Sequence, residues 1–259
     1  MRILVTNDDG IHAPGLAVAE SIARALSDDV WVVAPETEQS GASHSLTLTM
    51  PLRLREIEAK RFALTGTPTD CVMMGAAEIM KDSPPTLILS GVNRGSNLAD
   101  DVTYSGTIAG AMEGCALGIP SIALSQSYGW TERAQVSWAA AEDYGAPLVR
   151  RLVEAGWPDG VLMNINFPDT ELGPVQGIEI TAQGKRDMQT AALDRRVDAR
   201  GNPYYWIGFK RVKSEPVAGT DLHAIYNRRI SVTPLHMNLT EQRVVESLRK
   251  TVDIASLVT

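Results

Sequence analysis

The sequence predicts an α/β domain with a mostly parallel sheet, helices on both of its faces, and an antiparallel C-terminal extension. Two observations support this fold class. Up to about residue 166, short β-branched runs alternate with helix-length periodic segments, which is the pattern of a parallel sheet with helical crossovers. After Pro168, helix signals become scarce and strand-like pieces follow. With 259 residues and 44% hydrophobic composition, a single domain can bury a sizeable core.

The elements of the core, residues 1–166, follow one another at short intervals. We expect strands at residues 3–6, 30–34, 86–90, 121–125 and 161–166, and helices at residues 16–26, 68–80, 107–117 and 133–155. The second helix begins with Thr67-Pro68-Thr69-Asp70, which has the spacing of a capping box with proline at the first helical position. Alternating apolar residues between 45 and 64 predict an antiparallel hairpin that flanks the parallel sheet.

The C-terminal part is expected to form an extension, residues 167–238, followed by a helical end, residues 239–259. Strand-like pieces lie at residues 178–181, 204–210 and 230–233, and the last helix is expected at about 241–250 with Thr240 as its N-cap. Residues 185–213 contain eight Lys or Arg against three Asp, beside the run Tyr204-Tyr205-Trp206. This pattern indicates a solvated hairpin face with its aromatic side tucked inward, or else an oligomer contact or a substrate rim.

The charge balance limits the partners of the chain. There are 24 Lys plus Arg against 31 Asp plus Glu, and the net charge of -7 gives no general attraction to a nucleic acid polymer. A phosphate-bearing ligand therefore needs a local site, and a bound cation would provide one. Cys71 and Cys115 have no CxxC spacing and are expected to be reduced core thiols. With neither a secretion leader nor an apolar run of 18 residues, the sequence predicts a cytoplasmic protein without membrane contact.

Two adjacent acidic residues follow the first predicted strand. Asp8 and Asp9 come directly after residues 3–6, and ligands of open parallel sheets collect beyond the carboxyl ends of the strands. Adjacent carboxylates repel each other and resist the loss of water, a cost that a hard metal ion relieves. Asp9-Gly10 also fits an ordinary turn with Asp8 as its cap, so the pair alone leaves both interpretations open.

Polar groups in two later loops favour the metal interpretation. The loop after the second strand carries Ser40 beside Gly41, where a hydroxyl can complete an oxygen shell around a cation. The third strand is followed by a long loop, residues 91–106, and loops of this length are usually functional. It offers Asn93 as a neutral oxygen ligand, Arg94 and Asn97 as hydrogen-bond donors, and Ser105-Gly106-Thr107 as a helix N-terminus suited to a phosphate.

The remaining polar residues of these loops are expected to have structural roles. Asp100 and Asp101 would brace the long loop, because a phosphate site should not collect uncompensated carboxylates. His12 and His44 lie in the same loops as Asp9 and Ser40, and structural hydrogen bonds are the expected role, with proton transfer as the alternative.

Five motifs occur in order along nearly the whole chain: ILVTNDDGIHAPG, VVAPETEQSGASHSLT, LTGTPTDCV, SGVNRGSNLADDVTYSGTIAGAMEG and ISVTPLHMNLT. Together they resemble the family of the stationary-phase survival protein SurE, which consists of metal-dependent nucleotidases. The chain departs from the family pattern at Ser96, where proline is frequent, and at Ala99, where glycine is common. Neither departure affects a candidate ligand.

The resemblance implies a fold, a site and an activity. It implies a Rossmann-like core and a C-terminal hairpin exchanged between subunits of a homodimer or homotetramer. Asp8, Asp9, Ser40 and Asn93 would be ligands of one divalent ion per subunit, Mg or Mn, with Asp8 and Asp9 as the catalytic pair. Asn97, Ser105, Gly106 and Thr107 would face the phosphate. The implied reaction is hydrolysis of nucleoside 5'-monophosphates to nucleoside and phosphate by a metal-activated water, extending in some members to short polyphosphate.

Two other protein classes match the residues less well. Signalling receiver domains also carry an acidic pair after their first strand, but they need a phosphoacceptor Asp after the third strand, and residues 46–64 supply none. A nucleotide-binding module without catalysis would be expected to carry a GxxxxGK[ST] or GxGxxG motif, and both are absent from the sequence. Turnover of a nucleoside monophosphate would distinguish an enzyme from either class.

Overall fold

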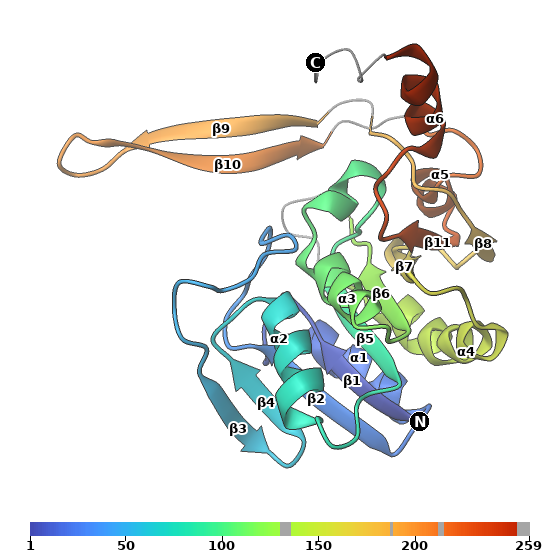
Figure 1. Cartoon of the computed structure of the whole chain (residues 1–259). Coiled ribbons are helices and arrows are strands. Elements are labelled where there is room, and N and C mark those ends of the chain that lie inside the picture. The colour runs from blue at the N-terminus through green and yellow to red at the C-terminus, as the bar shows by residue number, and fades with distance from the viewer. Residues whose placement is uncertain (130–135, 187–188, 212–214, 253–259) are drawn as a thin grey trace, which may run out of the picture.

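The computed structural model describes residues 1–129, 136–186, 189–211 and 215–252, and within them it shows one large mixed sheet and one separate hairpin (Figure 1). The strand order of the large sheet is β3-β4-β2-β1-β5-β6-β7-β11-β8. Its strands are β1 (Arg2–Thr6), β2 (Asp29–Pro35), β3 (Leu54–Glu58), β4 (Arg61–Leu64), β5 (Leu87–Arg94), β6 (Ser121–Gln126), β7 (Val161–Phe167), β8 (Ile178–Ile180) and β11 (Ile230–His236). The hairpin consists of β9 (Gln189–Val197) and β10 (Pro203–Arg211).

Helices cover both faces of the sheet, as the sequence predicts. Successive strand residues point to opposite faces, so Val5 packs with α1 (Pro14–Arg24) and α4 (Ala139–Ala155) in one core cluster. Leu4 packs on the other face with α2 (Pro68–Met74), next to which lies α3 (Gly106–Ala116). The five core strands β1, β2, β5, β6 and β7 pair in parallel and overlap the predicted strands, which confirms the fold class.

The flanking hairpin is also present, although it is shorter than the pattern predicts. β3 and β4 pair antiparallel and lie at the sheet edge beside β2. Strand β3 begins only at Leu54, and the preceding apolar residues form an irregular loop in which Leu48 is 84% exposed. The alternating apolar residues before Leu54 were not sufficient to extend β3, because they have no neighbouring strand to pair with.

Two helix predictions need correction. The capping box at Thr67 is present with both of its hydrogen bonds, but the α-helix ends at Met74 and continues as a π-helical turn, Gly75–Ile79. Gly75 lies against Leu4 of the central strand, where a Cβ atom would come within 2.8 Å of the leucine side chain. Helix α4 begins at Ala139, and residues 136–138 before it are not helical; the predicted start, residues 133–135, lies outside the described part of the chain.

The C-terminal part divides differently from the predicted extension. β11 pairs antiparallel with β7 and parallel with β8, so these strands widen the main sheet, and only β9 and β10 project from the body (Figure 1). Helix α5 (Asp221–Tyr226) precedes β11, and α6 (Gln242–Thr251) follows it with Glu241 as N-cap in place of Thr240.

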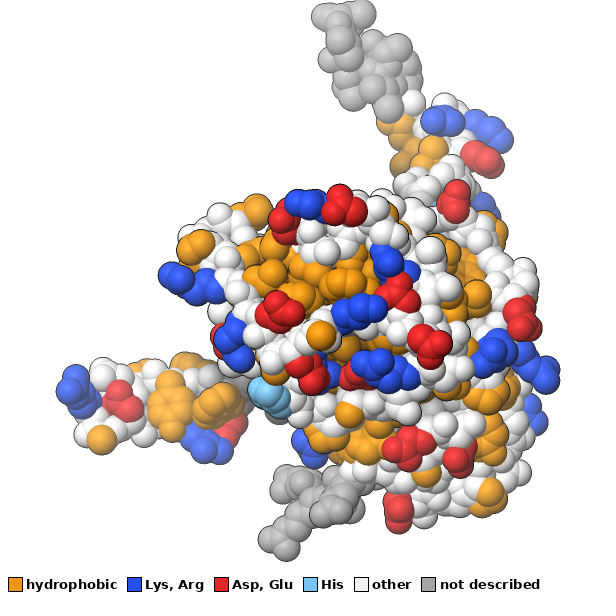
Figure 2. All heavy atoms as spheres, turned by 90° about the horizontal axis from the view of Figure 1, so that it is seen from below, with side chains coloured by type: hydrophobic (Ala, Val, Ile, Leu, Met, Phe, Trp, Pro, Cys, Tyr) orange, Lys and Arg blue, Asp and Glu red, His pale blue; other side chains and the backbone are white. Residues whose placement is uncertain are grey.

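The aromatic run of the projecting hairpin is exposed, so the expectation of an inward aromatic side is wrong. Trp206 is 61% exposed, and Tyr204 and Tyr205 are exposed beside it. The hairpin extends away from the large sheet in Figure 1, and in Figure 2 it forms the arm at the left, with hydrophobic side chains on its surface. Among the described helices, none is both long and apolar enough to span a bilayer.

Candidate functional site

The predicted site residues gather at one edge of the sheet, beyond the carboxyl ends of β1, β2 and β5. From β1 the chain passes through α1 to β2 on one side, whereas β5 lies on the other side of β1. This reversal leaves a crevice at the end of β1, where α/β proteins bind their ligands. Asp8 and Asp9 lie just after the end of β1, and Asn93 is the second-last residue of β5.

A bulge in β5 directs Asn93 toward this crevice. The pairing with β6 shifts between Ser90 and Asn93, so β5 accommodates an extra residue there. Gly91 makes the bulge possible, because it has a φ of 137° and a Cβ atom would lie 2.2 Å from the Leu124 carbonyl oxygen. The bulge is a local backbone feature at a functional edge, as is common beside active sites.

The carboxylate of Asp8 is almost fully buried. Asp8 is 4% exposed, and its Oδ1 accepts a hydrogen bond of 2.6 Å from the Thr107 hydroxyl. Burial raises the pKa of Asp8 to about 6, the Thr107 hydrogen bond opposes this rise, and repulsion from Asp9 adds to it. Burial likewise raises the pKa of Asp9, whose Oδ2 accepts the Arg94 backbone N–H at 3.0 Å. The two carboxylates therefore lie where a cation would stabilise both.

The N-terminus of α3 meets Asp8 at close range. Ser105 caps the helix, its Oγ accepting the backbone N–H of Ile108. A Cβ atom on Gly106 would lie 2.8 Å from the Asp8 Cβ, so only glycine fits between the helix and the carboxylate. Thr107 is fully buried, and its hydroxyl donates to Asp8. It is not among the residues that line the cavity beside Asp8.

A cavity of about 260 Å³ brings together most of the predicted ligands and phosphate-binding residues. Its walls include Asp8, Ser40, Asn93, Asn97 and Ser105. The Ser40 hydroxyl donates to Glu38 at 2.8 Å, and the Asn93 amide donates to the Gly95 carbonyl, which leaves the Asn93 side-chain oxygen for another partner. Five of the eight predicted site residues thus line one cavity, although they come from three loops.

Asn97 is held by a buried network on neighbouring strands. Its backbone N–H donates to Asn166 Oδ1 at 2.8 Å, and its carbonyl accepts from the amides of Asn164 and Asn166 on β7. Its own side-chain amide donates to the Ser125 hydroxyl. These contacts fix the position of the long loop over the strand ends.

The acidic residues of the long loop brace it, as the sequence analysis expects. Asp101 pairs with Arg186 at 2.7 Å, and Asp100 accepts the Arg186 backbone N–H. The buried carboxylate of Asp221, on α5, accepts the N–H of Ala99. The loop is therefore anchored to the C-terminal part of the chain.

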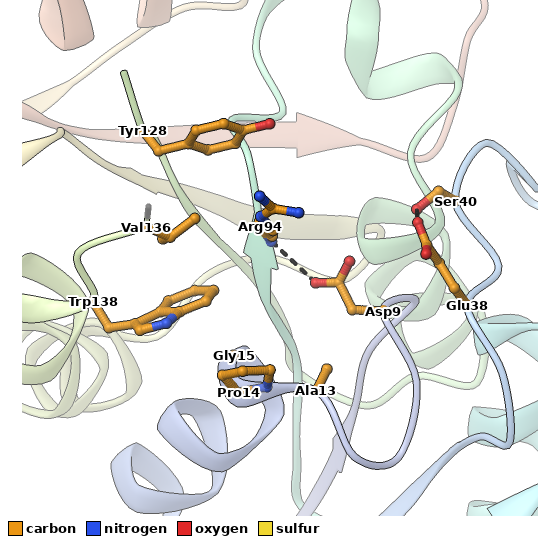
Figure 3. Close-up of a pocket in the computed structure, with 10 residues that line it drawn as sticks. All are labelled: Asp9, Ala13, Pro14, Gly15, Glu38, Ser40, Arg94, Tyr128, Val136 and Trp138. Atoms are coloured by element: carbon orange, nitrogen blue, oxygen red, sulfur yellow. Dashed lines mark hydrogen bonds between the residues drawn. The ribbon is translucent and has the colours of Figure 1, made fainter. Parts of the chain in front are cut away.

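A second cavity, of about 590 Å³, adjoins the first and shares Ser40 and Arg94 with it. Asp9 and Glu38 lie at one side, and Tyr128, Val136 and Trp138 at the other (Figure 3). The sequence analysis missed these three residues. Tyr128 follows β6 and Trp138 precedes α4, and only their place after a central strand connects them with the site.

The two loop histidines do not line either cavity. His12 is exposed, and His44 lies 3.1 Å from Glu113 on α3, which agrees with the structural role expected for it. Cys71 and Cys115 are buried free thiols, also as expected. Within the described residues, no three His, Cys, Asp or Glu side chains are grouped to hold a metal, so an ion here would rely on two carboxylates and neutral oxygens.

Comparison with known proteins places this arrangement in context. The family model described as "Survival protein SurE" matches residues 3–190. A protein of Parvibaculum lavamentivorans named 5'-nucleotidase SurE is 60% identical over 248 residues, which cover 96% of this chain and 90% of that protein. One of the same name from Caulobacter vibrioides is 56% identical over 250 residues, covering 96% and 95%. The crystal structure of the SurE protein from Aquifex aeolicus superposes with a TM-score of 0.81 at 38% identity, covering 96% of this chain and 99% of that one.

Proposed function

This chain belongs to the SurE family and is a 5'-nucleotidase, and we propose that it releases phosphate from nucleoside 5'-monophosphates with a divalent ion bound by Asp8, Asp9, Ser40 and Asn93. The observation that carries this proposal is the acidic pair at the end of β1. Asp8 is buried, Asp9 lies directly beside it, and the pKa of each carboxyl is raised. Family membership brings general metal dependence, and the two carboxylates support a metal site at the end of β1.

The ligand set suits a hard cation. The side chains are two carboxylates, a hydroxyl and an amide, all of which can offer oxygen. Mg²⁺ and Mn²⁺ prefer such oxygen ligands, whereas softer metals favour thiolate and imidazole. Burial of the pair without a cation is costly, because desolvation and mutual repulsion both disfavour the charged forms. We therefore propose one Mg or Mn ion per subunit.

The phosphate would lie over the N-terminus of α3. Backbone N–H groups of a helix N-terminus point outward and carry partial positive charge, which attracts an anion. Ser105 and Gly106 form this end of the helix, and Asn97 lines the same cavity. Thr107, which the motif groups with these residues, donates its hydroxyl to Asp8, and we propose that it positions this carboxylate.

The residues of the site would have separate roles in catalysis. A divalent ion supplies, when bound, neutralisation of the phosphate charge and a lower pKa for a nearby water. Thr107 holds one oxygen of Asp8, and the Arg94 backbone N–H holds one oxygen of Asp9. Asp9 lines the larger cavity, and its second oxygen is available to orient or deprotonate the attacking water. Arg94, on the wall of both cavities, supplies positive charge beside the phosphate.

The exposed side chains of the hairpin support a homo-oligomer, which we propose acts in the cytoplasm. The hairpin β9–β10 exposes Leu193, Trp206 and Ile207, and apolar side chains on a projecting element are typical of contacts between copies of a chain (Figure 2). A dimer or a tetramer is proposed, and light scattering on the purified protein distinguishes the two.

Phosphate release from AMP and GMP, with Mg²⁺, Mn²⁺ or a chelator, tests the reaction and the metal together. Asp9→Asn should lower the rate by more than about 100-fold, because each 1.36 kcal/mol of lost transition-state stabilisation costs a factor of ten. Asp28→Asn is the matched control, since Asp28 also belongs to an adjacent acidic pair but lies exposed just before β2. Full activity of Asp9→Asn, or equal activity in chelator, would overturn the proposal.

A further inference from the structure

The larger cavity beside the acidic pair has two chemically different ends. Figure 3 shows Asp9, Glu38 and Ser40 at one end, and Tyr128 and Trp138 at the other with Val136 between them. Its volume of about 590 Å³ falls within the range of pockets that bind small organic ligands. The metal and phosphate sites proposed above occupy the polar end and the adjoining smaller cavity. The aromatic end is left without a role.

Trp138 is fixed in place by the core below it. The indole belongs to the partly buried side chains packed on the core cluster that includes α1 and α4. It lies over Gly15, where a Cβ atom would come within 2.8 Å of the ring, so the first turn of α1 supports the indole from beneath. The ring therefore presents a preformed apolar surface to the cavity, and a planar ligand can bind there at little cost in side-chain ordering.

Tyr128 provides a second ring on the opposite side of the aromatic end. It is half-buried, and the guanidinium of Arg94 lies 5.3 Å from its ring centroid. This cation–π contact connects the aromatic end to the residue that the two cavities share. A ligand that reaches from the acidic pair to the rings therefore passes Arg94.

We propose that Trp138 and Tyr128 form the seat for the nucleobase, which stacks on these rings while the 5'-phosphate lies at the acidic pair. The inference rests on the proposed function and extends it to a part of the substrate that no motif specified. A nucleoside monophosphate has an anionic end and a flat aromatic end, and the joined cavities offer the matching surfaces in the matching order. Other phosphomonoesters, such as sugar phosphates, lack the aromatic group that this surface fits.

The seat also determines base selectivity. At the aromatic end, the described lining side chains are Tyr128, Val136 and Trp138, without a carboxylate or amide to read the edge of a base. Stacking on an aromatic ring is tolerant of sequence, because every base has a π face. The enzyme should accept both purine and pyrimidine nucleotides, with a preference for purines because their larger rings cover more of the surface.

The first experiment compares two substrates that differ only in the base. The values of kcat/KM are measured for AMP and for ribose 5-phosphate with Mn²⁺. Trp138→Ala should lower the ratio of AMP to ribose 5-phosphate by about 5- to 150-fold, the range that stacking on one aromatic ring supplies. Trp138→Phe should restore most of the ratio, and Tyr128→Ala should lower it as well. Trp157→Ala is the matched control, because Trp157 is also half-buried against the same core but lies outside both site cavities.

The second experiment needs no catalysis. Adenosine, which has no phosphate, is titrated into the protein in chelator while tryptophan fluorescence is followed. Adenosine should quench part of the emission of the five tryptophans, Trp138→Phe should remove that quench, and Trp157→Phe should retain it. If the wild-type protein hydrolyses no phosphomonoester yet shows this quench, the proposed function fails and the base seat stands. The base seat is overturned if Trp138→Ala and Trp138→Phe leave the AMP ratio within twofold of wild type, or if the quench persists in Trp138→Phe.

Discussion

Replacing Asp8 by asparagine should stabilise the metal-free protein, although it removes a proposed metal ligand. In the folded chain the Asp8 carboxyl is buried, and this raises its pKa from 3.8 to about 6. The unfolded chain exposes the group and restores its ordinary pKa. Between these two pKa values, the folded protein holds a proton that the unfolded chain releases. Stability therefore falls as the pH rises from about 4 to 6, and the full cost is present above that range.

The size of this cost follows from the shift. Two pKa units correspond to about 3 kcal/mol at pH 7 and above, and only about 1 kcal/mol of it is present at pH 4.5. Asparagine resembles the protonated carboxyl in shape, and its side-chain oxygen can still accept the Thr107 hydrogen bond. In chelator at pH 8, Asp8→Asn should be more stable than wild type by about 3 kcal/mol, which for a chain of this size raises Tm by about 6 to 12 °C.

Urea and thermal unfolding of both proteins at pH 4.5 and pH 8 measure this difference. Asp29→Asn is a control of opposite sign, because Lys60 and Arg2 hold the pKa of Asp29 well below its usual range. That variant should lose stability at pH 8 and not gain it. Added Mn²⁺ should stabilise wild type more than Asp8→Asn, since the gain grows with ligand concentration over Kd.

Two outcomes would refute the reasoning about Asp8. One is an Asp8→Asn protein that is less stable than wild type in chelator at pH 8, which would mean that the carboxylate is already compensated by its surroundings. The other is a difference of the same size at pH 4.5 and pH 8, which would attribute the effect to packing and not to ionisation.

Three further variants test the contacts of Asp8 and the anchoring of the long loop. Gly106→Ala should lower kcat/KM by at least about tenfold, because its Cβ would lie 2.8 Å from the Asp8 Cβ and displace the carboxylate. In the metal-free protein, Thr107→Val should raise the pKa of Asp8 further and shift the pH–stability profile upward by about one unit or more, since a hydrogen bond to a charged group contributes about 1.5–3 kcal/mol. Asp221→Asn should lower the free energy of unfolding by about 1–3 kcal/mol in urea. Both oxygens of the Asp221 carboxylate accept backbone N–H groups, so the NH2 group of asparagine would face a donor in either orientation, the N–H of Ala99 or those of Gly184 and Leu222.

Two control variants at exposed positions accompany these predictions. Ala116→Ser changes the exposed end of α3 and should leave activity near wild type, so a loss there would indicate that α3 responds to any substitution. Glu246→Gln removes an exposed charge on α6 and should leave unfolding unchanged. An unshifted profile in Thr107→Val, or unchanged stability in Asp221→Asn, would contradict the contacts assigned to them.

Local patterns in the sequence were sufficient for the core elements and for the outline of the site. The β-branched runs predicted the five central strands, because a strand buried on both faces needs apolar residues throughout. The capping box located the start of α2, because its two hydrogen bonds involve only residues close in sequence. The residues Asp8, Asn93 and Ser105 could be grouped in advance, because parallel strands deliver their following loops to one edge of the sheet.

Tertiary structure decided what depends on distant neighbours. The sequence does not show that Thr107 hydrogen-bonds Asp8 from behind, since 99 residues separate them, nor that β11 joins β7 while the aromatic run of β10 remains exposed. Trp138 belongs to no motif, and its place across the larger cavity from Asp9 follows from the packing of α4 on α1. Hydrophobic periodicity specifies which residues are buried, whereas the partner of a buried charge, its desolvation and the shape of a cavity arise only when separate segments pack together.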